Sequence, residues 1–265
     1  MRLVKRVIEI GNGAAVYVPK EYKGKEVVVL LPEGIKEVKR EVFSKLLEFM
    51  PNIMGVYLYG SYARSEETKD SDVDLLVIVQ EKDDNLKNAL KDFDARIITF
   101  KGVINSIENY PVLIIPILRE SKALMNSGLL EELKSKKIDF RKFGWSFDEI
   151  RKITKIIESF VKLDDKEIAP SHVSSLIMRL RVCYLIECLL KDKVSTNKGF
   201  GDKLSSYGLS KKEIDKFIDI YRIVRDGFEY GSKVNKEEVF KLLDITNNYL
   251  REIENETKKK IRKRN

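Results

Sequence analysis

The sequence predicts an α+β protein in three parts. These are a small N-terminal β-hairpin unit over residues 1–34, an α/β domain with a mixed sheet over 35–145, and a C-terminal antiparallel four-helix bundle over 146–257. Three observations predict this order: short strand-like runs separated by Gly and Pro, then alternating helical and β-rich patterns, then an apolar period that stays helical. Residues 258–265 form a basic tail.

The first segment has the pattern of a β-hairpin. Leu3–Ile10 and Ala15–Val18 alternate apolar and polar residues on either side of a Gly11-Asn12-Gly13 turn, and a third run covers Glu26–Leu31. Alternation around an Asn-Gly pair is the strongest short-range signal for a hairpin.

The middle segment alternates helices and strands. An amphipathic helix is predicted over Ile35–Phe49 and a second helix over Asp83–Lys91. The predicted strands are Val56–Tyr59, Val73–Val79, Arg96–Phe100 and Val112–Leu118. This order predicts an α/β domain with a mixed sheet.

The last segment repeats one helix-start signal. A Ser or Asn three residues before a Glu opens three predicted helices, at Ser146, Ser210 and Asn235. A further helix is predicted over Val173–Leu190, and short links between the four helices favour an antiparallel bundle.

Composition is typical of a cytoplasmic globular protein. Of 265 residues 43% are hydrophobic, and no run approaches the ~18 apolar residues of a membrane span. The charged N-terminus lacks a following apolar segment, so neither a signal peptide nor a membrane partner is expected. Cys183 and Cys188 lie five residues apart in one predicted helix and point in different directions, which argues against a disulfide and for a reducing compartment.

The net charge of +8 is concentrated at one end of the chain. Six of the positive charges lie in residues 258–264, so residues 1–257 carry about +2. We expect either a frayed basic tail that can contact phosphate backbones without sequence preference, or a solvated helix end.

One segment combines a turn suited to phosphate with acidic residues inside an apolar strand. Gly60-Ser61 follows the strand Val56–Tyr59 and precedes helix-favouring residues, a junction whose backbone N–H groups can bind phosphate. Asp72 and Asp74 lie two apart in the next strand, so their carboxylates share one face while the alternate residues face the core. Because adjacent carboxylates repel each other unless a cation lies between them, the pair indicates a Mg²⁺ site. The chemistry indicated is metal-assisted nucleotidyl transfer.

Gly60-Ser61, ten residues, then Asp72-Val73-Asp74 resembles the G-S-x10-D-x-D signature of the DNA polymerase β-like nucleotidyltransferase superfamily. Ala63-Arg64 and Ser71-Asp72 resemble its minimal nucleotidyltransferase branch, which usually has glycine where this chain has Ser65. The resemblance implies a nucleotidyltransferase domain that uses ATP or another NTP with two Mg²⁺ ions. It further implies that Gly60, Ser61 and Arg64 bind the nucleotide, and that Asp72 and Asp74 bind metal and are catalytic.

The resemblance also implies a third carboxylate on a later strand, as a metal ligand or a base toward the acceptor hydroxyl. Asp94, just before a β-rich run, is the candidate for this catalytic and metal-binding position, and Asp92 lies two residues earlier. If neither reaches the metals, the site would bind a nucleotide without turning it over. Two roles are likewise open for Arg64: contact with the triphosphate, or an ion pair with Glu66 or Glu67.

Two flanking segments resemble other modules. Tyr221–Tyr230 is similar to the R-x4-6-H end of HEPN-type helical domains, but Tyr230 stands at the histidine position, so HEPN ribonuclease chemistry is not expected. The bundle would instead close one side of the active cleft or form a dimer contact. Ile8–Glu21 resembles AbrB-like swapped-hairpin modules, which implies DNA and a homodimer as possible partners; a plain β-appendage is the alternative.

The sequence therefore predicts a cytoplasmic nucleotidyltransferase that passes an NMP, in the first instance AMP from ATP, to an acceptor hydroxyl on a protein or another macromolecule. Two alternatives stay open. One is a DNA-binding or antitoxin-like regulator with a nucleotide-sensing or inactive transferase fold. The other is a small-molecule nucleotidyltransferase of the antibiotic-modifying type, which shares the signature and a helical C-terminal half.

Overall fold

The computed structural model describes residues 8–10, 13–15, 18–24, 35–67, 71–163 and 167–263, and the chain divides into two compact units, residues 1–37 and 38–265. In the first unit, β1 (Ile8–Ile10) pairs antiparallel with β2 (Gly13–Ala15), and a 3₁₀ turn follows at Lys20–Tyr22. The predicted strand Glu26–Leu31 lies outside the described residues. The AbrB-like hairpin and its DNA contact stay predictions.

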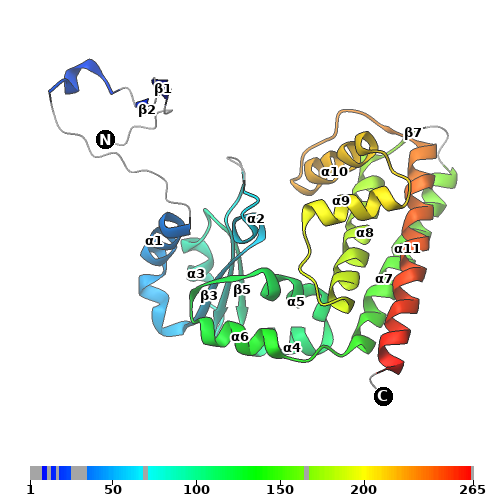
Figure 1. The fold of residues 1–265 in the computed structure, drawn as a ribbon, viewed down its shortest axis with the longest axis horizontal. Helices are drawn as coiled ribbons and strands as arrows, with labels where there is room; N and C mark the ends of the chain where they lie inside the picture. The colour runs from blue at the N-terminus through cyan, green and yellow to red at the C-terminus, as the bar shows by residue number, and fades with distance from the viewer. Residues whose placement is uncertain are drawn as a thin grey trace. The chain divides into compact units, whose positions relative to one another are not determined.

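The second unit contains the mixed sheet that the sequence predicts (Figure 1). Strand β3 runs antiparallel to both β4 and β6, whereas β4 and β5 are parallel, in the order β5-β4-β3-β6. The strands are β3 (Ile53–Tyr59), β4 (Asp74–Val79), β5 (Asp94–Thr99) and β6 (Lys122–Met125). The helices of this half are α1 (Ile35–Leu46), α2 (Gly60–Arg64), α3 (Asp84–Ala89), α4 (Phe100–Asn109), α5 (Pro111–Glu120) and α6 (Ser127–Ser135).

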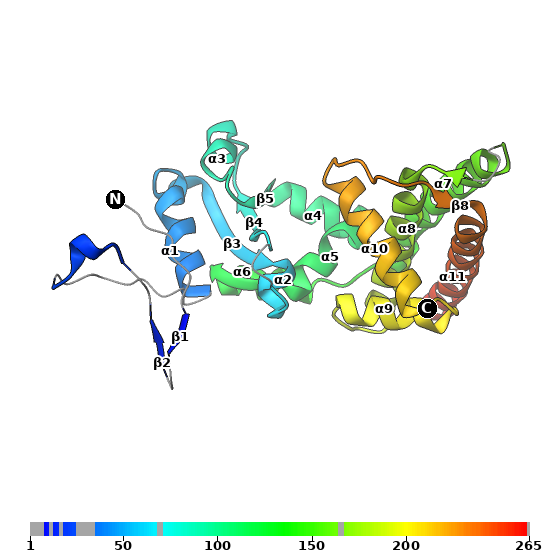
Figure 2. The ribbon, with the colours of Figure 1, turned by 90° about the horizontal axis from the view of Figure 1, so that it is seen from above.

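Helices cover both faces of the sheet, which explains why β4 is apolar beyond its first residue. Leu75, Val77 and Val79 pack with buried residues of α1 and α3, and Leu76 and Ile78 pack on the other face with α4, α5 and α6. Figure 2 shows α1 on one side of the strands and α4 and α5 on the other. The prediction that only one face of this strand is core was therefore wrong, because the face that Asp74 shares is also core from Leu76 onward.

The predicted strand Val112–Leu118 is instead part of helix α5. Pro111 occupies the first turn of α5, where its fixed φ favours a helix and its missing N–H costs nothing. The buried residues Pro111, Ile114, Ile115 and Leu118 recur at helical spacing and form the face that packs on the sheet. The fourth strand of the sheet is β6, which the sequence pattern does not predict.

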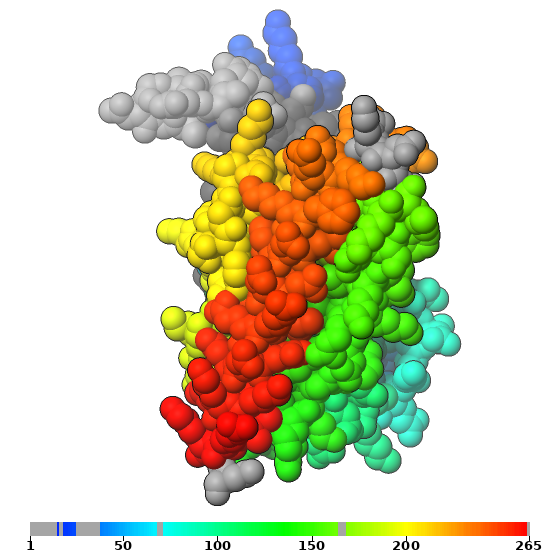
Figure 3. Space-filling view, turned by 90° about the vertical axis from the view of Figure 1, so that its right-hand side faces the viewer, coloured from blue at the N-terminus to red at the C-terminus, as the bar shows by residue number. Residues whose placement is uncertain are grey.

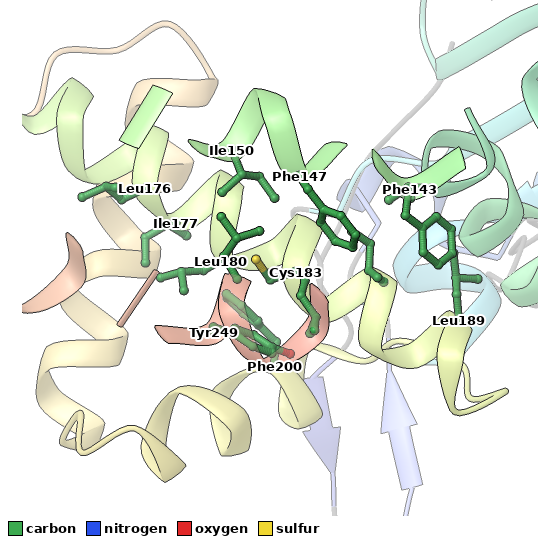
Figure 4. Close-up of a cluster of buried hydrophobic side chains, with 14 of the residues drawn as sticks. Phe143, Phe147, Ile150, Leu176, Ile177, Leu180, Cys183, Leu189, Phe200 and Tyr249 are labelled. Carbon is green, nitrogen blue, oxygen red and sulfur yellow. The ribbon is translucent and has the colours of Figure 1, made fainter. Parts of the chain in front are cut away.

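The helical half is organised around one long buried helix. Its helices are α7 (Gly144–Leu163), α8 (Pro170–Leu190), α9 (Asn197–Ser206), α10 (Lys211–Arg225) and α11 (Lys236–Arg262). Helix α8 packs against α7, α10 and α11, and Figure 4 shows its residues Leu176 to Cys183 between Ile150, Phe200 and Tyr249. The described residues therefore contain five helices in this half, one more than the predicted four.

Two of the three predicted helix starts are confirmed. Ser210 forms a reciprocal capping box with Glu213, and the Asn235 side chain accepts the N–H of Glu237. Ser146 is not a cap, since α7 already begins at Gly144 and Ser146 is buried inside its first turns.

The C-terminal basic residues continue a helix. Helix α11 extends to Arg262, with Thr257 buried and Ile261 packed against the core, so residues 258–262 are the expected solvated helix end and not a frayed tail. This helix lies alongside α7 (Figure 3). Within the described part of the chain, no helix has the length and apolar character needed to cross a membrane.

Candidate active site

The junction between β3 and α2 brings Gly60 and Asp74 into direct contact. Gly60 has a φ of +70°, and a Cβ atom at this position would lie 1.9 Å from Oδ2 of Asp74. Only glycine therefore allows both the turn and the position of this carboxylate. The β3–β4 register pairs Tyr59 with Asp74, so the turn and the acidic strand face each other as the sequence predicts.

Asp74 and Asp94 are neighbours at the same end of the sheet. They are the first residues of the parallel strands β4 and β5 and lie directly opposite each other in register. Asp72 is exposed and precedes the strand, which begins at Asp74 rather than at Val73. Asp92, the other candidate for the third carboxylate, forms an ion pair with Lys45 at 2.5 Å.

The local electrostatics disfavour further negative charge at this position. Burial raises the pKa of Asp74 to about 6, with smaller contributions from the charges of Asp94 and Glu120 that Arg64 partly offsets. Burial likewise raises the pKa of Tyr59 to about 12, and the charges of Asp74 and Asp94 add to the effect. A cation in this place would relieve the repulsion.

Glu120, the last residue of α5, is a site residue that the sequence pattern does not predict. Its carboxylate accepts the backbone N–H of Gly60 at 3.1 Å and Nη1 of Arg64 at 2.6 Å, and its side chain is 9% exposed. One signal was present in the sequence. An acidic residue in the last turn of a helix opposes the helix dipole and so calls for a compensating partner, but the sequence pattern predicts a strand at residues 112–118, so this signal is not visible there.

Arg64 forms an ion pair with Glu66, which is one of the two roles that the sequence predicts for it. Its Nε donates to Glu66 at 2.8 Å, in addition to the contact with Glu120. Ser61 lies in the first turn of α2, and its carbonyl accepts the N–H of Glu66 at 2.9 Å. Ser65 ends the helix with a φ of +57°, a left-handed conformation that explains why glycine is usual at this point of the resembling branch.

Comparison with known families identifies the family of the chain. Residues 35–195, more than half of the chain, match the model of a family described as a nucleotidyltransferase domain. The chain belongs to this nucleotidyltransferase family. The match covers the sheet, the turn and the acidic strands, and it extends through α8, so part of the helical half belongs to the matched region.

The nucleotidyltransferase matches no curated protein. Among solved structures it is similar to a spectinomycin adenyltransferase, AAD(9) from Enterococcus faecialis, crystallised with ATP and spectinomycin. The two share 17% identity over 83% of this chain and 98% of that chain, with a TM-score of 0.45. A TM-score this low supports no conclusion about the acceptor. The minimal branch and the HEPN-like resemblance stay predictions.

The helical half of the nucleotidyltransferase places a positive charge near the turn. The guanidinium of Arg181, on α8, lies over the rings of Phe200 at 4.9 Å and Tyr221 at 5.3 Å. Its Nη2 contacts Oδ1 of Asn197 at 3.5 Å, and Asn197 in turn contacts Glu66 at 3.5 Å. Among the described residues, the buried Nε of Arg181 has no hydrogen-bond partner.

The surroundings of Arg181 are positive. Burial, followed by the charges of Arg222, Arg225 and Arg64, holds the pKa of Arg181 below its usual range, although Tyr221 acts in the opposite direction. A buried guanidinium without a carboxylate partner is costly unless an anion arrives to neutralise it.

The residues present fit Mg²⁺. Across the described ranges, no group of three or more acidic, His or Cys side chains forms a metal site by itself. Mg²⁺ in nucleotide-using enzymes is commonly held by one or two carboxylates together with substrate phosphates, so a complete protein cage is not required. Asp74, crowded by Asp94 and the exposed Asp72, offers hard oxygen donors of this kind.

Proposed function

We propose that this nucleotidyltransferase passes an NMP, in the first instance AMP from ATP, to an acceptor hydroxyl on a protein or another macromolecule. One observation carries the proposal. The Asp74 carboxylate is packed against Gly60 at the phosphate-type turn and lies in register with Asp94, so turn and acidic residues meet at one end of the sheet.

Each predicted site residue has a role in this scheme. Gly60, Ser61 and Arg64 bind the nucleotide phosphates, and Asp72 and Asp74 hold Mg²⁺. When bound, Mg²⁺ polarises the phosphoryl group and neutralises charge on the leaving pyrophosphate. Asp94 is exposed at the edge of the site, so an acceptor can reach it.

The reaction is a displacement at the α-phosphorus. The acceptor oxygen forms a bond to this phosphorus while the bond to the bridging oxygen of the β-phosphate breaks, and pyrophosphate leaves with the bonding electrons. Asp94 accepts the proton of the acceptor hydroxyl. Correct placement of acceptor and nucleotide supplies much of the acceleration, because it converts the encounter into a step within one complex.

The arginine on α8 supports nucleotide binding. Arg181 lacks a carboxylate partner among the described residues and is connected through Asn197 and Glu66 to Arg64. A phosphate group bound between the turn and α8 would supply the missing negative charge.

The test uses ATP labelled either at the α- or at the γ-phosphate, incubated with Mg²⁺ and with separate protein, RNA and small-molecule fractions. Nucleotidyl transfer incorporates the α-label and not the γ-label, and the fraction that becomes labelled identifies the class of acceptor. We expect no incorporation with the double variant Asp72→Ala, Asp74→Ala, and strongly reduced incorporation with Asp94→Ala.

Asp92→Ala is the matched control. It removes an acidic residue two positions from Asp94 that is paired with Lys45 instead, and it should label as the wild type does. Equal labelling by the wild type and the double variant would refute the proposal.

A further inference from the structure

A single carboxylate occupies the donors that the proposed function assigns to phosphate. The backbone N–H of Gly60 and the Nη1 of Arg64 both donate to Glu120, at 3.1 and 2.6 Å. The ligand they hold is negatively charged and accepts hydrogen bonds with two oxygens, as a phosphate does. In this structure these donors are therefore satisfied from within the chain.

Apart from these two contacts, the surroundings of Glu120 disfavour its negative charge. Its side chain is only 9% exposed and ends helix α5, where the dipole disfavours negative charge. Its charge also acts on Asp74, which already faces Asp94. The hydrogen bonds from Gly60 and Arg64 therefore stabilise the Glu120 carboxylate against repulsion from the neighbouring carboxylates.

We propose that Glu120 stands in for a phosphate group and makes this site select nucleotides that carry a cation. The inference rests on the proposed function, since it presumes that Gly60 and Arg64 bind phosphate. A bare triphosphate must displace Glu120 and then lie beside three carboxylates. A nucleotide with its cation neutralises part of that charge, so it can take the two donors at a lower cost.

The surroundings allow this exchange. Arg64 keeps its second partner, Glu66, when Glu120 leaves, so the guanidinium stays at the turn. Glu120 is the last residue of α5, and Ser121 after it has extended backbone. The Glu120 side chain can therefore turn away without breaking the backbone hydrogen bonds of the helix. Arg119 next to it is anchored to Asp192 at 2.7 Å, which fixes the backbone on that side.

The experiment measures binding by titration calorimetry on the full chain. ATP and inorganic tripolyphosphate are titrated in EDTA, and ATP is titrated again with Mg²⁺. The variant Glu120→Gln keeps an acceptor for the Gly60 N–H and loses the charge. We expect it to bind both metal-free probes on the order of tenfold more tightly than the wild type, with a clearly smaller gain for ATP with Mg²⁺.

Glu66→Gln is the matched control, because it removes the other carboxylate on Arg64 but does not touch Gly60. It should change metal-free affinity far less than Glu120→Gln. An equal gain in both variants, or no gain in Glu120→Gln while the wild type binds ATP with Mg²⁺, overturns the role of Glu120. If neither protein binds ATP under any condition, the proposed function itself fails.

A second measurement needs no substitution. In the wild type, the amide resonance of Gly60 must shift when ATP and Mg²⁺ bind, because its acceptor changes from a carboxylate to a phosphate. A Gly60 amide that is unmoved at saturating ATP contradicts the inference even if Glu120→Gln does not fold.

Discussion

At the scale of single residues, Gly60 determines whether the turn and Asp74 can lie together. It combines a positive φ with a Cβ direction that points into the Asp74 carboxylate. Gly60→Ala should therefore lower the free energy of unfolding by about 3 kcal/mol, of which the left-handed backbone accounts for roughly 1 and the steric overlap for the rest. Nucleotidyl transfer should fall with it, because Asp74 must move. Urea denaturation and the label-transfer assay measure the two effects.

Gly208→Ala separates the two causes. Gly208 also has a positive φ, of +86°, but no atom lies within 4 Å of the position of its Cβ. It should lose only about 1 kcal/mol and retain transfer. Equal destabilisation by the two substitutions would mean that the contact with Asp74 contributes nothing.

At the scale of secondary-structure elements, features that depend on neighbouring residues could be predicted from the sequence, and contacts between distant residues could not. Strands β4 and β5 both begin with an aspartate, and Gly60 and Asp74 are close together in the sequence. The sequence predicts a strand where α5 lies because a short continuous apolar run fits both structures when its periodicity alone is considered. The contact between Glu120 and Gly60 joins residues sixty positions apart, and the α5 error hid the one local clue to it.

Helix α8 gives a prediction about Arg181. Arg181→Met keeps the packing between Phe200 and Tyr221 and removes the charge. We expect the affinity for ATP with Mg²⁺ to fall on the order of tenfold, by loss of a charge-assisted contact, while the melting temperature stays the same or rises, because an unpaired half-buried charge disappears. Calorimetry and thermal unfolding give the two values.

Arg179→Met is the control on the same helix. Arg179 is paired with Glu149 at 2.5 Å, so its loss should lower stability and leave nucleotide affinity unchanged. The reverse pattern, with Arg179 affecting affinity and Arg181 affecting only stability, would refute a ligand role for Arg181.

The contact of α8 with α9 and α11 predicts a pH-dependent contribution to stability. Burial opposes ionisation of Glu187, but donors from Lys191, Tyr249 and Lys203 outweigh it and hold the pKa of this carboxyl below its usual value of 4.5. A lowered pKa means that the contribution is complete above the usual value and is lost as the pH falls below it. Glu187→Gln should cost about 2 kcal/mol at pH 7, and the difference from the wild type should shrink as the pH falls below about 4.5.

Urea denaturation of both proteins at several pH values tests this. Glu158→Gln removes a carboxylate that is paired with Lys162 on the exposed side of α7, and it should change stability by less than about 0.5 kcal/mol. A Glu187→Gln deficit that is constant from neutral to acidic pH would show that the ionised carboxylate is not what stabilises this contact.

At the scale of the whole molecule, one cluster of buried residues extends across the predicted boundary at residues 145 and 146, while a second cluster lies on the other face of the sheet. Buried residues of the sheet such as Tyr57 and Leu76 belong to the same cluster as Leu189 of α8 and Phe217 of α10. Figure 4 shows Phe143, just before that boundary, beside Leu189. A boundary drawn from the change of hydrophobic period marks where the secondary structure changes, but it does not show that the packing is interrupted.

This continuity predicts a single unfolding transition for the sheet and the helical half. Trp145, the one tryptophan of the chain, meets the ring of Tyr110 edge-on at 5.6 Å and so reports on the junction, whereas far-ultraviolet circular dichroism reports mainly on the helices. The two signals should change at the same urea concentration. Leu189→Ala should lower the free energy of unfolding by about 3 kcal/mol as measured by either signal. Leu113→Ala, at a position that is 50% exposed, should change it little by either signal. Two transitions at separate urea concentrations would show instead that the halves unfold independently, as the predicted boundary implies.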